Sequence, residues 1–274
     1  IIELSMCVFE ESLSKDIAHI NSLDDIAGNR NDIIFLGNSL TRHGIDKNKI
    51  RKSLSNSSQI GYIYPDDTSI IEWYYIFKSY FVDKNNVPNN IIIFFAIDQL
   101  RSSEIEFEEI QRISKYVPLF RSSFVLNREN LSLSEIIDFY LCKAFNIYAN
   151  RERLSKRVLD LLPKYRQLIR YINNNTPNEQ KALKGEDYSH FNDIIQLADS
   201  VGCKIWFCAM PVQKKYMIKD EIISIIKKSK YSRIYDLRDP DIYGDIHFLD
   251  GYHLNQYGAT TFTTKLIDNL QLDK

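Results

Sequence analysis

Five short runs of apolar and β-branched residues recur along this chain of 274 residues, and the segments between them have helical character. The runs cover residues 33–36, 59–64, 91–97, 204–210 and 233–237. Helices are predicted at 47–55, 69–82, 188–201, 220–228 and 256–270. Continuous apolar runs are typical of parallel strands that helices cover on both faces. The alternation therefore predicts an α/β fold with a doubly wound, mostly parallel five-stranded sheet.

The spacing of these runs also predicts how the chain is divided. The long stretch between the third and fourth runs, about 101–185, has helical spacing and is expected to be a helical insertion in a domain of residues 33–274. Residues 1–32 are acidic and are expected to form a lead-in segment. Residues 151–170 carry seven Lys or Arg. This basic stretch is either a solvated helix surface or a contact for anionic polymer or lipid headgroups.

The overall composition argues against several classes of protein. The net charge of −1 gives no reason to expect a nucleic-acid partner. The four cysteines lack CxxC spacing, so they are expected to be core residues, and neither a metal site nor a cofactor motif is found. No apolar stretch approaches the roughly 20 residues that span a bilayer. Because the chain begins at Ile1, an anchor or leader is expected to have been removed.

Two short motifs carry residues suited to nucleophilic chemistry. The first apolar run leads directly into Gly37-Asn38-Ser39, and a late loop contains Asp250 and His253. A serine hydroxyl becomes a nucleophile when a base takes its proton, and an acid can orient that base. In a doubly wound sheet both segments emerge at the carboxyl edge of the strands. We therefore predict Ser39 as nucleophile, His253 as base and Asp250 as orienting acid, with His247 as the second candidate for the base.

Each motif also has a purely structural interpretation. Ser39 can cap a helix, Asp250 can close a turn with Gly251, and His253 can be a polar loop residue. A strand that runs through a glycine and a serine into a helix is also a common phosphate-binding turn. The combination of the two motifs favours the serine site over these alternatives.

The two motifs resemble the first and last blocks of the SGNH/GDSL hydrolase superfamily: Gly37-Asn38-Ser39-Leu40-Thr41, and Asp250-x-x-His253-Leu-Asn-x-x-Gly258. The segment FLGNSLTRHGID, followed by the helical insertion, is similar to SGNH-like proteins that accompany acylation of bacterial surface polysaccharide or teichoic acid. The resemblance implies a flavodoxin-like SGNH fold and the same three roles for Ser39, His253 and Asp250. It also favours a location outside the cytoplasm, since many of these proteins are membrane-anchored with the domain outside, and it leaves a cytoplasmic location open.

The interior blocks of the family match less well. The family expects a glycine after the second strand, where this chain has no glycine, so a backbone N–H of Asp67 or Thr68 would have to serve the oxyanion. Asp98 falls where the family has an asparagine donor. It could donate only if burial kept it protonated; otherwise Gln99 must supply the amide. Arg42, just past the nucleophile, is a candidate for binding an acceptor or an anionic sugar.

These features predict an acyl-ester hydrolase or O-acyltransferase, most simply for acetyl groups on a bacterial surface glycan. The expected partners are this ester substrate and a membrane-bound acyl-transfer protein, with no cofactor. Two alternatives remain: a catalytically weak or inactive SGNH-like scaffold that binds glycans, and a phosphate-binding α/β module.

Overall fold

The structure is a computed structural model that describes residues 22–29, 31–54, 59–102, 105, 107–151, 187–239 and 241–270. The chain divides into two compact units. One unit comprises Leu23–Ser102 and Asp187–Lys274 and contains the sheet; the other contains the helices between residues 107 and 151. We refer to them as the sheet unit and the helical unit.

The sheet unit is built on five parallel strands. They are β1 (Ile33–Leu36), β2 (Ile60–Ile63), β3 (Asn90–Phe95), β4 (Lys204–Ala209) and β5 (Ser232–Asp236). The spatial order is β2-β1-β3-β4-β5, and every neighbouring pair is parallel. The predicted α/β class and the five strands are confirmed, with ends that differ by one or two residues. β1 and β3 are central, so the chain leaves β1 at the middle of the carboxyl edge.

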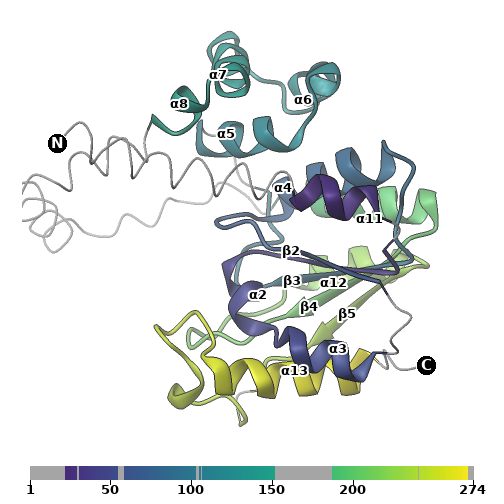
Figure 1. Ribbon diagram of the computed structural model, residues 1–274, viewed down its shortest axis with the longest axis vertical. Helices are drawn as coiled ribbons and strands as arrows, with labels where there is room; N and C mark the ends of the chain where they lie inside the picture. Colours follow the sequence, from purple (N-terminus) through teal and green to yellow (C-terminus); the bar gives the residue numbers. More distant parts are fainter. Residues whose placement is uncertain are drawn as a thin grey trace, which may run out of the picture. The chain divides into compact units, whose positions relative to one another are not determined.

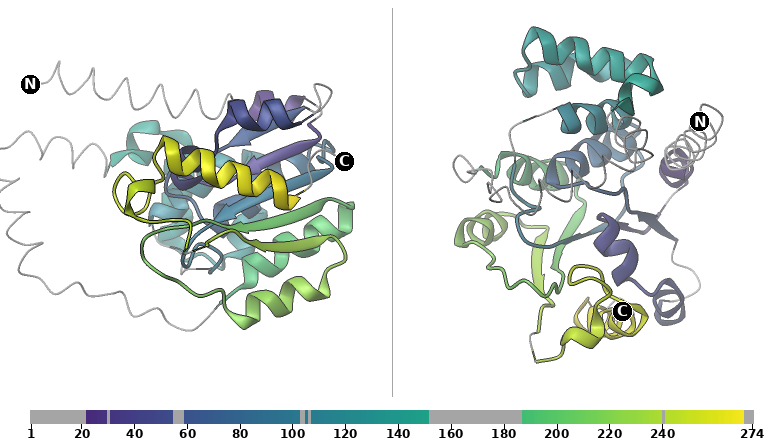
Figure 2. Two further views of the ribbon diagram at one scale, coloured as in Figure 1. Left: turned by 90° about the horizontal axis from the view of Figure 1, so that it is seen from below. Right: turned by 90° about the vertical axis from the view of Figure 1, so that its left-hand side faces the viewer.

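Helices cover both faces of this sheet (Figure 1). One face carries α4 (Ile70–Ile76), its continuation η1 (Phe77–Val82) and α11 (Ser189–Val201), while α12 (Asp220–Lys228) connects β4 to β5. The other face carries α2 (Ser39–Gly44), α3 (Lys47–Ser53) and α13 (Gln256–Leu270), and α13 packs on both α2 and α3 (Figure 2). The predicted helix 69–82 differs in its second half, where η1 is a π-helix that buries four of its six residues.

Aromatic side chains fill the space between the layers. Phe94 on β3 lies between Phe35 and Phe262, with ring centroids 5.6 and 6.1 Å apart respectively. On the opposite face Phe191 meets Phe207 at 4.8 Å. Each buried side chain of this size contributes roughly 1.5–3 kcal/mol. Trp73, which could have formed a sugar-stacking platform, is fully buried in this core instead.

Cysteines belong to the core as well, as predicted. Cys142, Cys203 and Cys208 are free and buried, and burial raises the pKa of Cys142 to about 11 and that of Cys203 to about 12. Their thiols are therefore protonated at neutral pH and act as small apolar groups. Cys7 lies outside the described residues.

The described part of the predicted insertion is helical. It contains α5 (Phe107–Tyr116), η2 (Leu119–Arg121), α6 (Ser122–Arg128), α7 (Leu133–Ala144) and α8 (Asn146–Ala149). α5 packs against α7, and the Lys143 ammonium on α7 donates to the carbonyl oxygens of Ser114 and Val117. In the parts of the chain that the structure describes, no helix has the length and hydrophobicity of a transmembrane span.

Two predicted segments lie wholly or mostly outside the described residues. Of the basic stretch 151–170, the structure describes Arg151 alone. Of the lead-in, residues 22–28 are helical and bury Leu23 and Ala27.

Candidate active site

The turn after β1 presents Ser39 as the first residue of α2. Gly37 makes this turn possible, because a Cβ at that position would lie only 2.0 Å from Thr41 Oγ1. The chain can therefore bend directly from a buried strand into a helix that begins at the sheet edge. Ser39 is partly exposed, whereas its neighbours on both sides are buried.

Asn38 holds this turn in place through both ends of its amide. Its Oδ1 accepts from Leu40 N at 3.0 Å and caps α2, while its Nδ2 donates to the Thr68 carbonyl at 3.0 Å. The residue is 4% exposed. Its amide therefore ties the turn after β1 to the turn after β2, a structural role that a carboxylate could not fill because it has no donor.

The second motif forms a compact turn before α13. Asp250 Oδ1 accepts from the backbone N–H groups of Tyr252 and His253 at 3.0 and 2.8 Å. Gly251 has φ = 84°, a left-handed conformation that glycine adopts without a steric penalty. Leu249 N donates to His253 O at 2.8 Å and closes the turn. The spacing of three residues thus allows one carboxylate to shape the backbone that carries the imidazole.

The structure brings the two motifs together. Asp250 Oδ2 lies 2.8 Å from His253 Nδ1, and His253 Nε2 lies 3.1 Å from Ser39 Oγ. An ionised carboxylate can only accept, so Nδ1 must carry the proton that it donates to Asp250. Nε2 of the neutral ring is then the acceptor for the Ser39 hydroxyl. This is the geometry that serine nucleophiles require.

Electrostatics favour this arrangement of protons. The backbone N–H of His253, then its ring N–H and then the N–H of Tyr252 hold the pKa of Asp250 well below its usual range. Asp250 is therefore ionised at every pH at which the fold is expected to work. A carboxylate in that position keeps the imidazole in one tautomer and stabilises an imidazolium when it forms.

His43 adds a second imidazole to the site. It lies four residues after Ser39 on α2, and its ring meets that of His253 edge-on at 5.0 Å. Partial burial, then the neighbouring charges of His253 and Arg42, lower the pKa of His43 below 6.5. The i, i+4 spacing on a helix could have indicated that His43 shares a face with Ser39, but the contact with His253 depends on the loop.

Of the residues predicted after β2, Thr68 is engaged in local bonds through its side chain. The buried Thr68 hydroxyl donates to Pro65 O at 2.9 Å and accepts from Trp73 Nε1 at 3.0 Å. Asp67 is exposed and has φ = 55°. The neighbouring carboxylate of Asp66 forms an ion pair with Arg42, and both side chains are about half exposed. Arg42 thus links α2 to this turn at the surface, in addition to the buried hydrogen bond from Asn38.

The turn after β3 contains the other predicted donors. Ile97 has φ = 53°, which is strained for a β-branched residue. Asp98 is exposed, so the burial that would let a protonated carboxyl donate is not found there. Gln99 Oε1 accepts from Ala96 N at 2.8 Å. Since the carbonyl end of that amide is occupied, its NH2 group is the part that can donate to a ligand.

His247, the second candidate for the base, supports the loop instead. It is 6% exposed, stacks on Tyr257 with centroids 4.8 Å apart, and its Nδ1 lies 3.2 Å from Gly244 O. Asn255 caps α13, since its Oδ1 accepts from Gly258 N at 3.0 Å. These contacts fix the start of α13 directly after the turn that carries His253.

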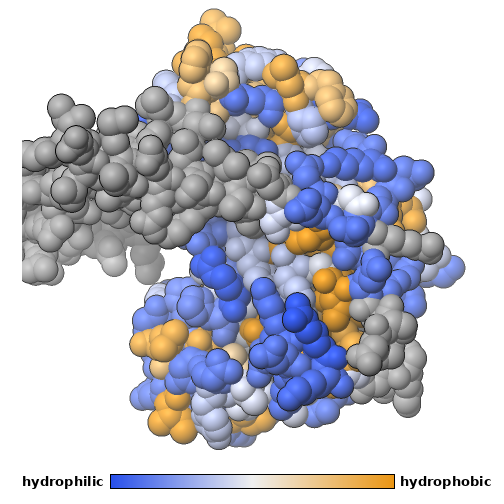
Figure 3. All heavy atoms as spheres, viewed as in Figure 1, coloured by the Kyte–Doolittle hydropathy of each residue, from blue (hydrophilic) through white to orange (hydrophobic). Residues whose placement is uncertain are grey.

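The rim formed by this loop is apolar. Ile246 and Leu249 are 72% and 63% exposed, and hydrophobic side chains gather over this loop in the surface view (Figure 3). The loop that carries His253 thus exposes apolar side chains, whereas Arg42 and Asp66 form a charged pair.

Fold and site together define a class: an α/β protein whose parallel sheet presents a hydrogen-bonded serine, histidine and aspartate at its carboxyl edge. No protein-family model matches the chain and no curated protein matches it. Among the described residues, no group of three or more His, Cys, Asp or Glu side chains could hold a metal ion. The geometry of this site is therefore the basis on which a function can be assigned.

Proposed function

We propose that the protein is a serine-dependent acyl-ester hydrolase or O-acyltransferase of SGNH type that acts on acetyl esters of a bacterial surface glycan. The observation that supports this proposal best is the continuous hydrogen-bond chain from Ser39 Oγ through the His253 ring to the Asp250 carboxylate. In this proposal the substrate lies outside the cytoplasm, and a membrane-bound partner supplies acyl groups where the reaction is a transfer.

The proposed reaction has two steps. Ser39 Oγ attacks the ester carbonyl while His253 Nε2 takes its proton, and the alcohol then leaves with that proton. In the second step water or a sugar hydroxyl, deprotonated by the same imidazole, attacks the acyl-enzyme. The acyl group leaves with this acceptor, and the imidazole returns the proton to Ser39 Oγ. Asp250 holds the ring and stabilises its charge in both steps. Hydrolysis and transfer share this chemistry and differ only in the acceptor.

A fluorophosphonate probe, which labels activated serines, tests the proposal directly. We expect labelling of the wild-type chain, none in Ser39→Ala, and a rate at least about a thousandfold lower in His253→Ala. Ser200→Ala is a matched control, because Ser200 is an exposed serine on α11 whose hydroxyl bonds only its own helix at Leu197 O. Equal labelling of Ser39→Ala and wild type would refute the role of Ser39.

The exposed position of Asp98 favours one alternative, a glycan-binding SGNH-like scaffold. Loss of one oxyanion donor lowers a rate by about a hundred- to a thousandfold. A scaffold predicts no labelling between about pH 6 and pH 9, together with binding of glycan that persists in Ser39→Ala. A phosphate-binding module would instead bind a phosphorylated ligand equally well after His253→Ala.

A further inference from the structure

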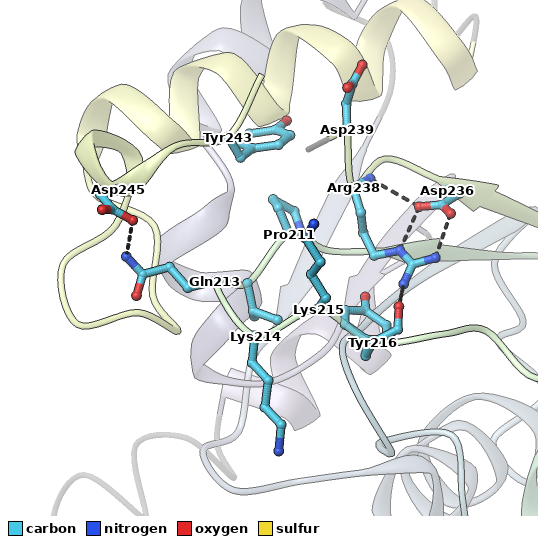
Figure 4. Close-up of a pocket in the computed structure, with 11 residues that line it drawn as sticks. Pro211, Gln213, Lys214, Lys215, Tyr216, Asp236, Arg238, Asp239, Tyr243 and Asp245 are labelled. Carbon is cyan, nitrogen blue, oxygen red and sulfur yellow. Dashed lines mark hydrogen bonds and ion pairs between the residues drawn. The ribbon is translucent and has the colours of Figure 1, made fainter. Parts of the chain in front are cut away.

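A second polar pocket lies beyond the carboxyl ends of β4 and β5 (Figure 4). Its volume is about 490 Å³, and it is lined by residues 211–216, 236, 238, 239, 243 and 245, all in the sheet unit. Pockets that hold small molecules have volumes of about 300–1,000 Å³. The proposed reaction at Ser39 makes no use of this space.

Arg238, Asp236 and Tyr216 form the floor of the pocket and are held by several contacts. The Arg238 guanidinium donates to both oxygens of Asp236, from Nε and Nη2 at 2.7 and 2.6 Å, and stacks 4.2 Å above the Tyr216 ring. It also donates to the Tyr216 carbonyl oxygen. The Tyr216 hydroxyl in turn donates to Met210 O at 2.8 Å, just past β4. Because Arg238 and Asp236 neutralise each other, the floor offers polar contacts and an aromatic face without net charge.

The other carboxylates of the pocket also have partners. Asp239 Oδ2 lies 3.2 Å from the Lys265 ammonium, and Asp245 Oδ1 accepts from Gln213 Nε2 at 3.0 Å. These oxygens can still accept a hydrogen bond from a ligand hydroxyl, since a carboxylate has about four acceptor positions. The pocket walls therefore present two acceptors: Asp239, whose charge Lys265 compensates, and Asp245, whose partner is a neutral amide.

Three groups of the lining have no partner among the described residues: Lys214, Lys215 and the Tyr243 hydroxyl. Figure 4 shows the Lys215 side chain directed toward Pro211 and Tyr243, whereas that of Lys214 extends away from them. No hydrogen bond or ion pair connects Lys215 to the described part of the chain. The Tyr243 hydroxyl is buried and likewise lacks a partner there, and burial raises its pKa, so it is a protonated donor. The Tyr243 hydroxyl has almost no exposed surface, so a ligand in the pocket contacts other atoms of Tyr243 and not this hydroxyl.

We propose that this pocket binds a sugar unit that carries a carboxylate or a phosphate. A sugar supplies hydroxyl donors that match Asp239 and Asp245, and its ring faces pack on aromatic side chains. The negative group pairs with the Lys215 ammonium, which no ion pair engages among the described residues. A neutral sugar would leave that ammonium unpaired, so the charge adds to affinity and selectivity.

The pocket also adjoins the loop that carries Asp250 and His253. Gln213 N donates to Gly251 O at 2.9 Å, and the Gln213 side chain reaches Asp245 on the same loop. A sugar bound here would lie against that loop. We assign it as the glycan part of the ester substrate or acceptor, an assignment that rests on the proposed function, whereas binding itself does not.

Binding can be measured on the full chain carrying Ser39→Ala, so that no turnover occurs. Saturation-transfer NMR would compare methyl β-D-glucuronide with methyl β-D-glucoside, which differ only in the carboxylate, and would include glucose 1-phosphate. We expect at least one of the two anionic sugars to bind about tenfold more tightly than the neutral sugar. Lys215→Gln should remove this difference, and Lys214→Gln, the matched neighbour that points away, should leave it unchanged.

The result distinguishes the sources of charge and separates this inference from the proposed function. Tighter binding of the glucuronide assigns a uronic acid, and tighter binding of glucose 1-phosphate assigns a sugar phosphate. Equal affinity for charged and neutral sugars, no saturation by any of them, or no effect of Lys215→Gln would overturn the inference, whatever the labelling of Ser39. Charge-selective binding without labelling of Ser39 would overturn the proposed reaction and leave the pocket as a glycan site.

Discussion

At the scale of single residues, Asn38 shows how one amide can support a neighbouring nucleophile. Both ends of its side chain are used, and both bonds are buried. Asn38→Asp would keep the cap on α2 but replace the donor to Thr68 O by an oxygen. We expect the free energy of unfolding to fall by about 1–3 kcal/mol. Urea titration would measure it, with Asn48→Asp, an exposed change in the first turn of α3, as control. Equal stability of both variants would contradict this role.

A substitution at Asp98 tests whether the turn after β3 supplies an oxyanion donor. It is exposed in the turn after β3, where the SGNH resemblance predicts an asparagine donor. If this turn faces the oxyanion, Asp98→Asn adds a donor and removes a nearby negative charge. We expect the rate of fluorophosphonate labelling to rise by about tenfold to a hundredfold. An unchanged rate would mean that Gln99 or a backbone N–H acts instead. Asp193→Asn, remote on α11, controls for the general effect of charge.

His43 predicts a pH dependence of stability. Its pKa is lowered in the folded chain by burial, then by His253 and Arg42, against smaller opposing effects of Asp250 and Asp66. The unfolded chain therefore takes up this proton first as the pH falls below about 6.5, which favours unfolding. Above that range the residue is neutral in both states and contributes nothing.

The measurement compares wild type with His43→Gln. Between about pH 8 and pH 5 the melting temperature of wild type should fall further than that of the variant, because only wild type binds the extra proton on unfolding. All other titrating groups are common to both proteins. Parallel curves would show that the neighbourhood of His253 does not disfavour a charged His43.

At the scale of elements, the approach of α13 to the preceding loop decides where His253 lies. Gly258 sits in the first turn of α13, and a Cβ there would come within 2.4 Å of the His247 carbonyl oxygen. That atom is backbone, so the loop itself would have to move. We expect Gly258→Ala to lower the free energy of unfolding by about 1–3 kcal/mol and to slow the labelling of Ser39.

Gly28→Ala is the matched control for this prediction. A Cβ at Gly28 meets no atom within 4 Å, so the change should be neutral or slightly stabilising. If Gly258→Ala behaved like Gly28→Ala, the close packing of α13 on the loop would not be important for the site.

At the scale of the whole molecule, the sheet unit consists of two chain segments, and the end of the first at Ser102 lies beside the start of the second at Asp187. Ser102 N donates to Asp187 O at 2.8 Å, and Ser102 Oγ accepts from His190 N at 3.1 Å. A short linker can therefore join Ser102 to Asp187 without strain. The sheet unit also has its own core on both faces of the sheet.

We expect a chain of Leu23–Ser102 joined through two glycines to Asp187–Lys274 to unfold cooperatively and to retain labelling of Ser39. Circular dichroism during a urea titration would measure the first property. A folded protein without labelling would assign the helical unit a part in the reaction. A non-cooperative transition would show that the sheet unit depends on the removed residues.

Much of this architecture was predictable from local patterns. Apolar runs such as residues 33–36 and 91–97 predicted β1 and β3 because a strand buried on both faces has few polar positions. Helix ends at residues 220, 228, 256 and 270 agreed with the structure, since charge and capping patterns are local. The π-helix η1 was not predicted, because a wider turn depends on what the core can accommodate and not on periodicity alone.

Local patterns in the chain were enough to show which residue types could do chemistry and at which edge of a parallel sheet they would emerge, because strand direction and order along the chain follow from such patterns. The packed fold was needed to show that Ser39 and His253 lie within hydrogen-bond distance, that His43 contacts the same imidazole, and that Gln213 connects the loop to a polar pocket. Such contacts join segments that are far apart in the chain, and their distances are set by how helices and loops pack, which no local pattern encodes.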